Sequence, residues 1–416
     1  MEIEEITMKT ELMEKYAGLI LKTGLNLQKG QSLVITCPVE CADFARLCTK
    51  TAYDMGAREV ILNWIDDFIT RQKYLKADSS VFDTFPAWRK AFYDEAADGK
   101  YAWLRIDADD PESLSGVDPD RILRSSRASA GPLENFRDKQ MVNYFKWCIA
   151  SVPSKAWAKR VFPDLTEGEA MESLWQAILS SVRVNESSDP VSNWKEHIST
   201  LKNRVNILNS YRFRYLHYKN SLGTDLKIEL PPTHFWEGGS EKDSDGADFC
   251  ANMPTEEIYT VPKRDGVNGI VYSSKPLSIN GNIAENFSFR FENGKIVEIK
   301  AEKGLELLKT ETSLDAGASY LGEVALVPYN SPISNSGILF YNTLFDENAS
   351  CHLAFGDSYP LIEGGRDMTK EELKKAGINS SITHTDFMVG TADLSITGIT
   401  WDGDEIEVFK DGNFTF

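Results

Sequence analysis

Short apolar runs alternate with amphipathic stretches along the first half of the chain. The apolar runs have the length and the β-branched content of buried strands, while the longer stretches have helical spacing. The expected strands cover Ser32–Thr36, Glu59–Trp64, 101–107 and 146–150, and the expected helices cover 13–25 and 42–55. Strands that alternate with helices of this length are typical of βαβ units. The first half therefore predicts an α/β domain with a mainly parallel sheet.

The turn after the first expected strand carries no nucleotide-binding fingerprint. It reads Cys37-Pro38-Val39-Glu40, without GxGxxG or GxxxxGK[ST]. Such glycine-rich loops let the backbone approach a phosphate closely. We therefore interpret the N-terminal half as a scaffold or as one wall of a substrate cavity.

From about Tyr215 the apolar positions change to strict alternation. Segments such as Leu226–Leu230 and Phe287–Phe291 alternate with period two, and Asn-Gly and Asp-Gly pairs punctuate the second half. This pattern predicts a β-rich α+β domain with a few helices. The expected organisation is an α/β scaffold domain over residues 1–214 and a second domain over residues 215–416.

Composition and charge narrow the classes of function. The 416 residues favour two domains, and the formal net charge is −18. A nucleic-acid-binding protein needs a basic face, and no Lys/Arg cluster supplies one, so neither nucleic acid nor an anionic membrane surface is an expected partner. The N-terminus lacks the basic and apolar regions of a signal peptide, and no apolar stretch is long enough to span a membrane. We therefore expect a cytoplasmic protein.

The six cysteines do not suggest a disulfide framework or a zinc finger. No CxxC pair occurs, and a chain of this length does not need disulfide bonds for stability. Reduced thiols are the expected state.

The five histidines are the first candidates for metal or proton chemistry, because His is the most frequent metal ligand and general base. His197 lies in a polar helical segment and is expected on the surface. His217 belongs to a strand entry and is expected to be structural. His234 lies in the loop PPTHFWEGG, where it either lines a pocket or packs structurally. His352 and His384 differ from these because carboxylates accompany them.

Carboxylates accompany these two histidines, and one pair has the spacing of half a metal site. His384 and Asp386 are two residues apart in an expected strand, so their side chains project to the same face. Glu323 is the lone charge in the apolar run LGEVALVP, where it must be paired, coordinated or terminal. Glu256 and Glu257 precede another apolar run in NMPTEEIYTVP.

Each of these residues also has a simpler interpretation. The adjacent glutamates would suit a solvated strand edge, Glu323 would suit an arginine partner, and His352 would suit a satisfied core position. As a set, two Glu, two His and one Asp are nitrogen and oxygen donors that suit Zn²⁺, Co²⁺ or Mn²⁺. Three carboxylates also neutralise much of the charge of two ions about 3.5–4 Å apart.

Several long motifs resemble one family of metallopeptidases. They are NMPTEEIYTVP, SSKPLSINGNIAENF, LGEVALVPYNSPISNSGILFYNTLFDENASCHLAFGDSYP and HTDFMVGTADLSITGI. Together with KYAGLILKTGLNLQKGQSLVI and the closing DGNFTF, they make nearly the whole chain similar to the thermophilic aminopeptidase family, which includes aminopeptidase T and the aminopeptidase S or PepS-like enzymes.

The resemblance implies two divalent metal ions, Zn²⁺, Co²⁺ or Mn²⁺, in a C-terminal catalytic domain. The ligands that it implies are Glu257, Glu323, His352, His384 and Asp386. Glu257 is preferred to Glu256 because its spacing to Glu323 fits the family better. The resemblance also implies a tyrosine at the site, Tyr359, and a homodimer whose active sites open into an internal cavity.

The implied activity is metal-dependent release of N-terminal amino acids from short peptides with a free N-terminus. In this interpretation an acid at Glu256 or Glu257 relays a proton, with Glu256 as the choice if Glu257 is a ligand. Tyr359 donates a hydrogen bond to the developing oxyanion, or is simply a core aromatic. The alternatives are another dinuclear metal amidohydrolase or dipeptidase, and a non-catalytic binding protein on the same scaffold.

Overall fold

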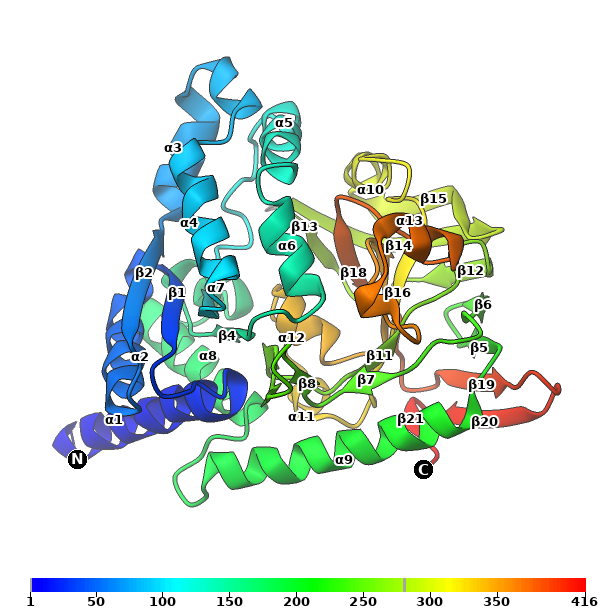
Figure 1. Cartoon of the computed structure of the whole chain (residues 1–416). Helices are drawn as coiled ribbons and strands as arrows, with labels where there is room; N and C mark the ends of the chain where they lie inside the picture. Colours follow the sequence, from blue (N-terminus) through cyan, green and yellow to red (C-terminus); the bar gives the residue numbers. More distant parts are fainter. Residues whose placement is uncertain (1, 280–281) are drawn as a thin grey trace. The chain divides into compact units, whose positions relative to one another are not determined.

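The computed structural model describes residues 2–279 and 282–416 and forms two compact units (Figure 1). The first unit comprises residues 2–197 and 240–254, and the second comprises residues 198–239 and 255–416. The chain therefore passes between the units more than once. The assignment of a scaffold role to residues 1–214 and a catalytic role to residues 215–416 stays a prediction.

The first unit is built on a parallel sheet with the strand order β10-β4-β3-β1-β2. Its strands are β1 (Ser32–Pro38), β2 (Glu59–Ile65), β3 (Ala102–Asp107), β4 (Trp147–Ser151) and β10 (Asn252–Met253). β1 is buried at every position, as expected for an interior parallel strand that is covered on both faces. The predicted parallel sheet is thus confirmed.

Helices connect these strands, as the alternating pattern predicts. They are α1 (Glu2–Leu19), α2 (Ala42–Asp54), α3 (Asp67–Lys76), α4 (Ala87–Asp98), α5 (Pro119–Ala130), α6 (Glu134–Met141), α7 (Lys155–Val161) and α8 (Glu167–Ser181), with short turns η1 (Ile20–Gly24), η2 (Val39–Cys41) and η3 (Ser79–Asp83). Local sequence fixes several helix starts. At α8, Thr166 and Glu169 form a reciprocal capping box.

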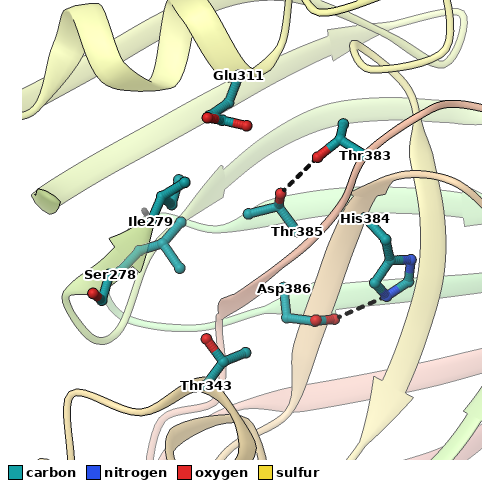
Figure 2. Close-up of a pocket in the computed structure, with 9 residues that line it drawn as sticks. Ser278, Ile279, Glu311, Thr343, Thr383, His384, Thr385 and Asp386 are labelled. Atoms are coloured by element: carbon teal, nitrogen blue, oxygen red, sulfur yellow. Dashed lines mark hydrogen bonds and ion pairs between the residues drawn. The ribbon is translucent and has the colours of Figure 1, made fainter. Parts of the chain in front are cut away.

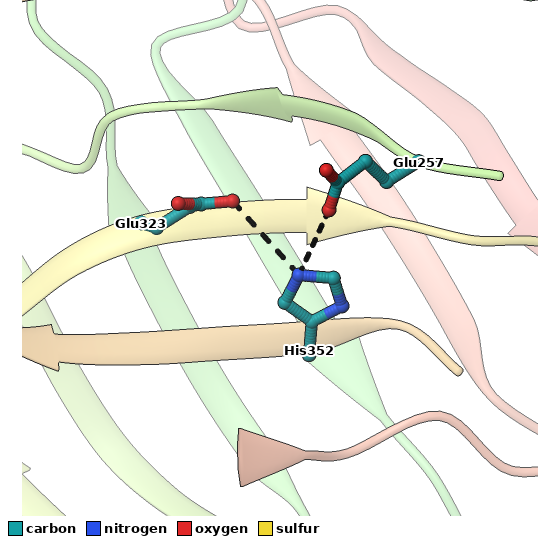
Figure 3. Close-up of side chains that lie close together, drawn as sticks. All are labelled: Glu257, Glu323 and His352. Carbon is teal, nitrogen blue, oxygen red and sulfur yellow. Dashed lines mark ion pairs between the residues drawn. The ribbon is translucent and has the colours of Figure 1, made fainter. Parts of the chain in front are cut away.

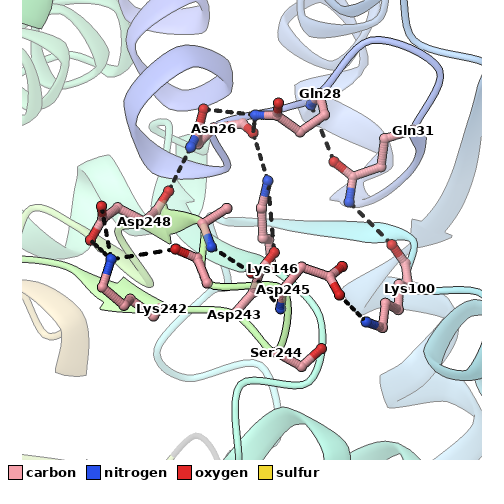
Figure 4. A network of polar contacts seen from close by, with 12 residues as sticks. Asn26, Gln28, Gln31, Lys100, Lys146, Lys242, Asp243, Ser244, Asp245 and Asp248 are labelled. Atoms are coloured by element: carbon pink, nitrogen blue, oxygen red, sulfur yellow. Dashed lines mark hydrogen bonds and ion pairs between the residues drawn. The ribbon is translucent and has the colours of Figure 1, made fainter.

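Residues 240–254 come from the second half of the chain but belong to the first unit. They supply the edge strand β10 and a small hairpin of β8 (Glu241–Lys242) and β9 (Asp248–Phe249). Figure 4 shows the polar network that fastens this insert. The buried Lys146 Nζ donates to the Asn26 carbonyl at 2.9 Å and lies 3.8 Å from the Asp243 carboxylate. Period-two alternation cannot reveal so short an edge strand.

The second unit contains two antiparallel sheets, and α9 (Pro190–Tyr211) enters it from the first unit. We call the sheet with strand order β18-β17-β16-β11-β7 the site sheet. Its strands are β7 (Glu237–Gly238), β11 (Ile258–Thr260), β16 (Leu321–Leu326), β17 (His352–Gly356) and β18 (His384–Met388). The β-rich character predicted for the second half is confirmed.

The other sheet has the order β13-β14-β12-β6-β5-β19-β20-β21, with β15 paired to β14. Its strands are β5 (Tyr215–Lys219), β6 (Asp225–Glu229), β12 (Val267–Tyr272), β13 (Leu277–Ile279), β14 (Asn282–Glu292), β15 (Lys295–Lys303), β19 (Ser395–Ile399), β20 (Glu405–Lys410) and β21 (Asn413–Phe414). Short helices α10 (Leu305–Glu311), α11 (Pro332–Asn335), α12 (Thr343–Glu347), η4 (Gly365–Asp367) and α13 (Lys370–Lys375) connect the strands.

The two sheets of the second unit share an apolar core. Phe355 on β17 and Phe387 on β18 contact Phe289 on β14, with ring centroids 5.8 and 5.1 Å apart. Leu353 and Val324 belong to the same buried cluster. This packing fixes one face of the site sheet and leaves its other face for polar side chains. None of the described helices is both long and apolar enough to cross a bilayer.

Candidate metal centre

Three neighbouring strands of the site sheet present polar side chains on one face. Ala354 on β17 pairs with Asp386 on β18 and with Glu323 on β16. Directly paired residues of antiparallel strands project to the same face, so these three form one row. By the period of two along a strand, His384 and His352 project to that face as well. The phenylalanines that alternate with them point into the core.

The central position of this row is small. Ala354 lies between the carboxylate-bearing residues Asp386 and Glu323, and Ala325 and Gly356 occupy neighbouring positions on the same face. Large side chains there would fill the space in front of the carboxylates. The face therefore places small side chains between its donor groups.

A β-bulge sets the position of Glu323. The pairing of β16 with β17 shifts between Leu321 and Glu323, so Gly322 is the extra residue. A Cβ atom on Gly322 would lie only 2.1 Å from the carbonyl oxygen of Asp357. That same oxygen accepts a hydrogen bond from His384, so glycine at this bulge permits the close approach that orients the histidine.

Both histidines direct the same ring nitrogen to the carboxylates. His352 Nδ1 lies 3.1 Å from the carbonyl oxygens of Glu347 and Ser350, and His384 Nδ1 lies 2.8 Å from that of Asp357. A carbonyl only accepts, so each Nδ1 carries the hydrogen and donates it. In the neutral ring, Nε2 then carries no hydrogen and its lone pair can ligate a metal ion. This is the usual arrangement of a histidine that ligates a metal.

Each Nε2 atom faces two carboxylates. Figure 3 shows both partners of His352, and Figure 2 shows Asp386 beside His384. His352 Nε2 is 3.1 Å from Glu257 Oε2 and 3.9 Å from Glu323 Oε1. His384 Nε2 is 3.3 Å from Glu323 Oε2 and 3.4 Å from Asp386 Oδ1. The structure thus brings together all five residues that the sequence predicted as ligands.

Among the described residues, three overlapping groups have the geometry to hold a metal ion, with one donor atom per residue within 4.8 Å of the others. They are Glu257–Glu323–His352, Glu323–His384–Asp386 and Glu347–His352–Asp386. Glu323, His352 and Asp386 each belong to two groups. The donors are imidazole nitrogens and carboxylate oxygens, which suits a transition-series divalent ion.

Electrostatics of the site favour added positive charge. Burial raises the pKa of Glu347 well above its ordinary value, and the charges of Asp386 and Glu257 raise it further. Burial also raises the pKa of Glu323, although His384 opposes the change. Burial alone would lower the pKa of His352, but the Glu257 hydrogen bond and the surrounding carboxylates raise it to about 10. Such a cluster is stabilised by cations, which a divalent metal supplies.

Glu347 is the residue of the site that the sequence analysis missed. It is the last residue of α12, it is buried, and its backbone carbonyl also accepts from His352. The sequence signal for Glu347 was its position five residues before His352 in FDENASCHLAF. A helical residue that meets a strand residue has no fixed sequence period, so pattern alone did not select it.

Glu256 is not a member of any of the three candidate groups found among the described residues. Its backbone N–H donates to Asn348 Oδ1 at 2.7 Å, and its charge acts on Arg204, whose pKa is lowered by burial and partly restored by Glu256. The geometry therefore agrees with the choice of Glu257 over Glu256 as the ligand. The role of Glu256 in proton transfer stays a prediction.

Tyr359 lies beside the site. Its ring centroid is 6.0 Å from that of His384, with the planes at 71°, and 5.7 Å from that of Tyr259. The ring thus flanks one of the predicted ligands and also packs against a neighbouring aromatic. Both interpretations of Tyr359 are compatible with this position.

The remaining histidines lie outside these groups. His217 pairs with Asp225 on the neighbouring strand at 2.6 Å. His234 is buried and its Nδ1 contacts the Pro231 carbonyl oxygen at 2.7 Å. His197 on α9 contacts the Trp194 ring edge-on at 5.6 Å.

Replacing Ala354 by leucine is expected to empty the site without changing any donor. The added carbons would project between Asp386 and Glu323, and overpacking typically costs about 1–3 kcal/mol. We expect bound metal to be lost and kcat/KM to fall by about 100-fold or more, as measured by elemental analysis and peptide hydrolysis. Ala376→Leu, on an exposed position after α13, is the matched control and should behave as wild type. Retention of metal by Ala354→Leu would contradict the proposed geometry.

Comparison with known proteins places the chain in one family. The model of the family described as thermophilic metalloprotease (M29) matches residues 9–414. Aminopeptidase AmpS of Bacillus subtilis is 46% identical over 98% of this chain and 99% of its own length, and aminopeptidase 2 of Geobacillus stearothermophilus is 43% identical over 97% and 98%. The structure of wild-type AmpT from Thermus thermophilus superposes with a TM-score of 0.90 at 36% identity, covering 98% of this chain and all of that one. The chain belongs to the thermophilic metalloprotease (M29) family.

Proposed function

We propose that the protein is an aminopeptidase that removes single residues from the free N-terminus of short peptides and uses two divalent metal ions. The observation that carries the proposal is the set of three donor groups that share Glu323, His352 and Asp386. Donors shared between groups suit a pair of ions held a few ångströms apart. The curated relatives named above are aminopeptidases, which supports the choice of reaction.

The residues would divide the work of holding the ions. Glu257 and His352 would ligate one ion, His384 the other, and Glu323 and Asp386 would be shared, with Glu347 as a further donor on the His352 side. The carbonyls that accept from each Nδ1 would keep both rings oriented. When bound, the ions would supply Lewis-acid activation of water and of the scissile carbonyl. Zn²⁺, Co²⁺ and Mn²⁺ all suit this donor set.

Two further residues are proposed to act on the substrate. The Tyr359 hydroxyl would donate a hydrogen bond to the oxygen of the scissile carbonyl as negative charge develops there. Glu256 would take part in moving the proton from water to the leaving amine. From the family resemblance we also propose a homodimer and a cytoplasmic location.

Peptide hydrolysis followed by mass spectrometry tests the proposed reaction. Leucyl-glycyl-glycine should lose residues one at a time from its N-terminus, and its N-acetylated form should be nearly inert. The reason is that acetylation removes the positive charge that an acidic site attracts and adds bulk where the chain must end. Internal cleavage of longer peptides would indicate an endopeptidase. Equal cleavage of the acetylated peptide would indicate a general amidase.

A further inference from the structure

The parallel sheet of the first unit has one long open edge. β2 is its terminal strand, with seven residues, and no other described strand pairs with its outer side (Figure 1). The opposite edge strand, β10, has only two residues. β2 lacks the features by which edge strands usually avoid pairing, because it contains no proline, its register with β1 shows no bulge, and its one charged residue, Glu59, stands at its start. This edge is therefore fit to accept a further strand.

One hydrogen bond of β2 shows which of its peptide groups face outward. The Val60 N–H donates to the Tyr53 hydroxyl at 3.2 Å instead of to β1. Alternate residues of a strand turn their peptide groups to the same side, so Leu62 and Trp64 also present N–H and C=O groups at the open edge. Tyr53 is exposed, and its ring can turn away from the edge when a partner strand takes the place of its hydroxyl.

Large apolar side chains are exposed at the carboxyl end of this strand. Trp64 is 45% exposed, and Phe68 and Ile69 in the first turn of α3 are 70% and 65% exposed. Single exposed apolar residues are ordinary on a protein surface, but three within six positions are not scattered. Such a group marks an interaction site, and a partner that pairs with β2 would approach it.

The two ends of β2 carry opposite charges at matching distances from its centre. Arg58 precedes the strand, is exposed, and forms no ion pair among the described residues. Asp66 follows the strand in an extended conformation, and its Oδ1 accepts the Ile69 N–H at the start of α3. Both residues lie four positions from Leu62. In an antiparallel pair of two copies centred on Leu62, each Arg58 would therefore stand directly opposite the partner's Asp66.

We propose that two copies of this chain associate through β2, as antiparallel strands related by a two-fold axis at Leu62. Val60 would exchange both hydrogen bonds with the partner's Trp64, and Leu62 with the partner's Leu62. The occupant is a second copy because the edge complements itself in hydrogen bonding and in charge, as a two-fold interface requires. The proposal assigns an interface to the homodimer suggested above and does not depend on the peptidase reaction.

Cysteine cross-linking tests the register. In Leu62→Cys the two thiols would face each other across the axis, with Cα atoms about 5.5 Å apart, which is within the range of a disulfide. In Glu59→Cys, the matched control, they would be about 20 Å apart along the strands. The six native cysteines are all buried and compete little. After mild oxidation, a non-reducing gel should show at least about tenfold more covalent dimer from Leu62→Cys. Equal yields, or no cross-link from Leu62→Cys, would overturn the proposal.

Sedimentation velocity over a dilution series measures the association itself. Leu62→Pro removes an N–H that faces outward rather than one bonded to β1, so the dimer Kd should rise by at least about 100-fold with little change in thermal midpoint. Arg58→Glu, which needs no change in the strand, should raise Kd by about tenfold because like charges would then face each other. Arg127→Glu, exposed on α5, is the matched control and should stay within about twofold of wild type.

The contrary results separate this interface from the homodimer itself. A wild-type dimer that Arg58→Glu and folded Leu62→Pro leave intact would show that β2 is not the interface, while the homodimer would stand. A wild-type protein that is monomeric at about 100 μM would contradict both, because even a weak specific dimer forms at that concentration.

Discussion

Replacing His352 by alanine is expected to reduce peptide hydrolysis by at least about 100-fold and to lower the bound metal. His352 takes part in two of the three donor groups, and its Nε2 lies between Glu257 and Glu323. Loss of the imidazole ring would remove one ligand from the ions that these buried carboxylates are proposed to hold. The measurements are kcat/KM on a leucyl anilide and metal content by elemental analysis.

The matched control for this change is His217→Ala. His217 lies in the same unit, on β5, and its partner Asp225 is 63% exposed, so solvent screens the pair and it contributes little to stability. We expect wild-type activity and metal content from it. Near wild-type turnover and metal content in His352→Ala would show that the site is wrongly assigned.

Removal of metal by a chelator is expected to abolish hydrolysis, and added Zn²⁺, Co²⁺ or Mn²⁺ should restore it. Among the described residues, the donor groups are the constellation that can activate water, and their carboxylates repel one another without cations. Since metal binds the folded chain, its removal should also lower the thermal midpoint. A ligand present at about 1,000 times its Kd stabilises by about 4 kcal/mol.

Elemental analysis must accompany this experiment, because a tightly bound ion survives mild chelation. Full activity in protein shown to be metal-free would end the hypothesis of metal catalysis. Loss of activity with unchanged metal content would instead indicate inhibition by the chelator itself. Comparison of the three restored enzymes would show which ion gives the highest kcat.

Strands with regular alternation could be predicted from the sequence because their period is a local property. His384 and Asp386 do share one face of β18, and Glu323 does lie in a buried strand. The sequence also separated His352 and His384 from the other histidines through the carboxylates that accompany them. Residue types and spacing therefore singled out candidates, and the family resemblance selected the ligand set among them.

Other features depend on contacts that no local period encodes. Glu347 reaches the cluster from the end of a short helix, and the bulge at Gly322 is visible only when β16 is paired with β17. Whether Glu256 or Glu257 faces the other donors is likewise decided by the path of the chain into β11. A cavity that His384 and Asp386 line is likewise assembled from four elements that are distant in sequence.

The contribution of β10 to the first unit has a consequence for synthesis on the ribosome. The parallel sheet ends in a strand from residues 252–253 of the 416-residue chain, so well over half of the chain is made before this strand emerges. Until then β4 is an open edge, and open edges invite pairing with other chains. A nascent chain or a fragment that stops before this strand would therefore need a chaperone more than the finished protein does.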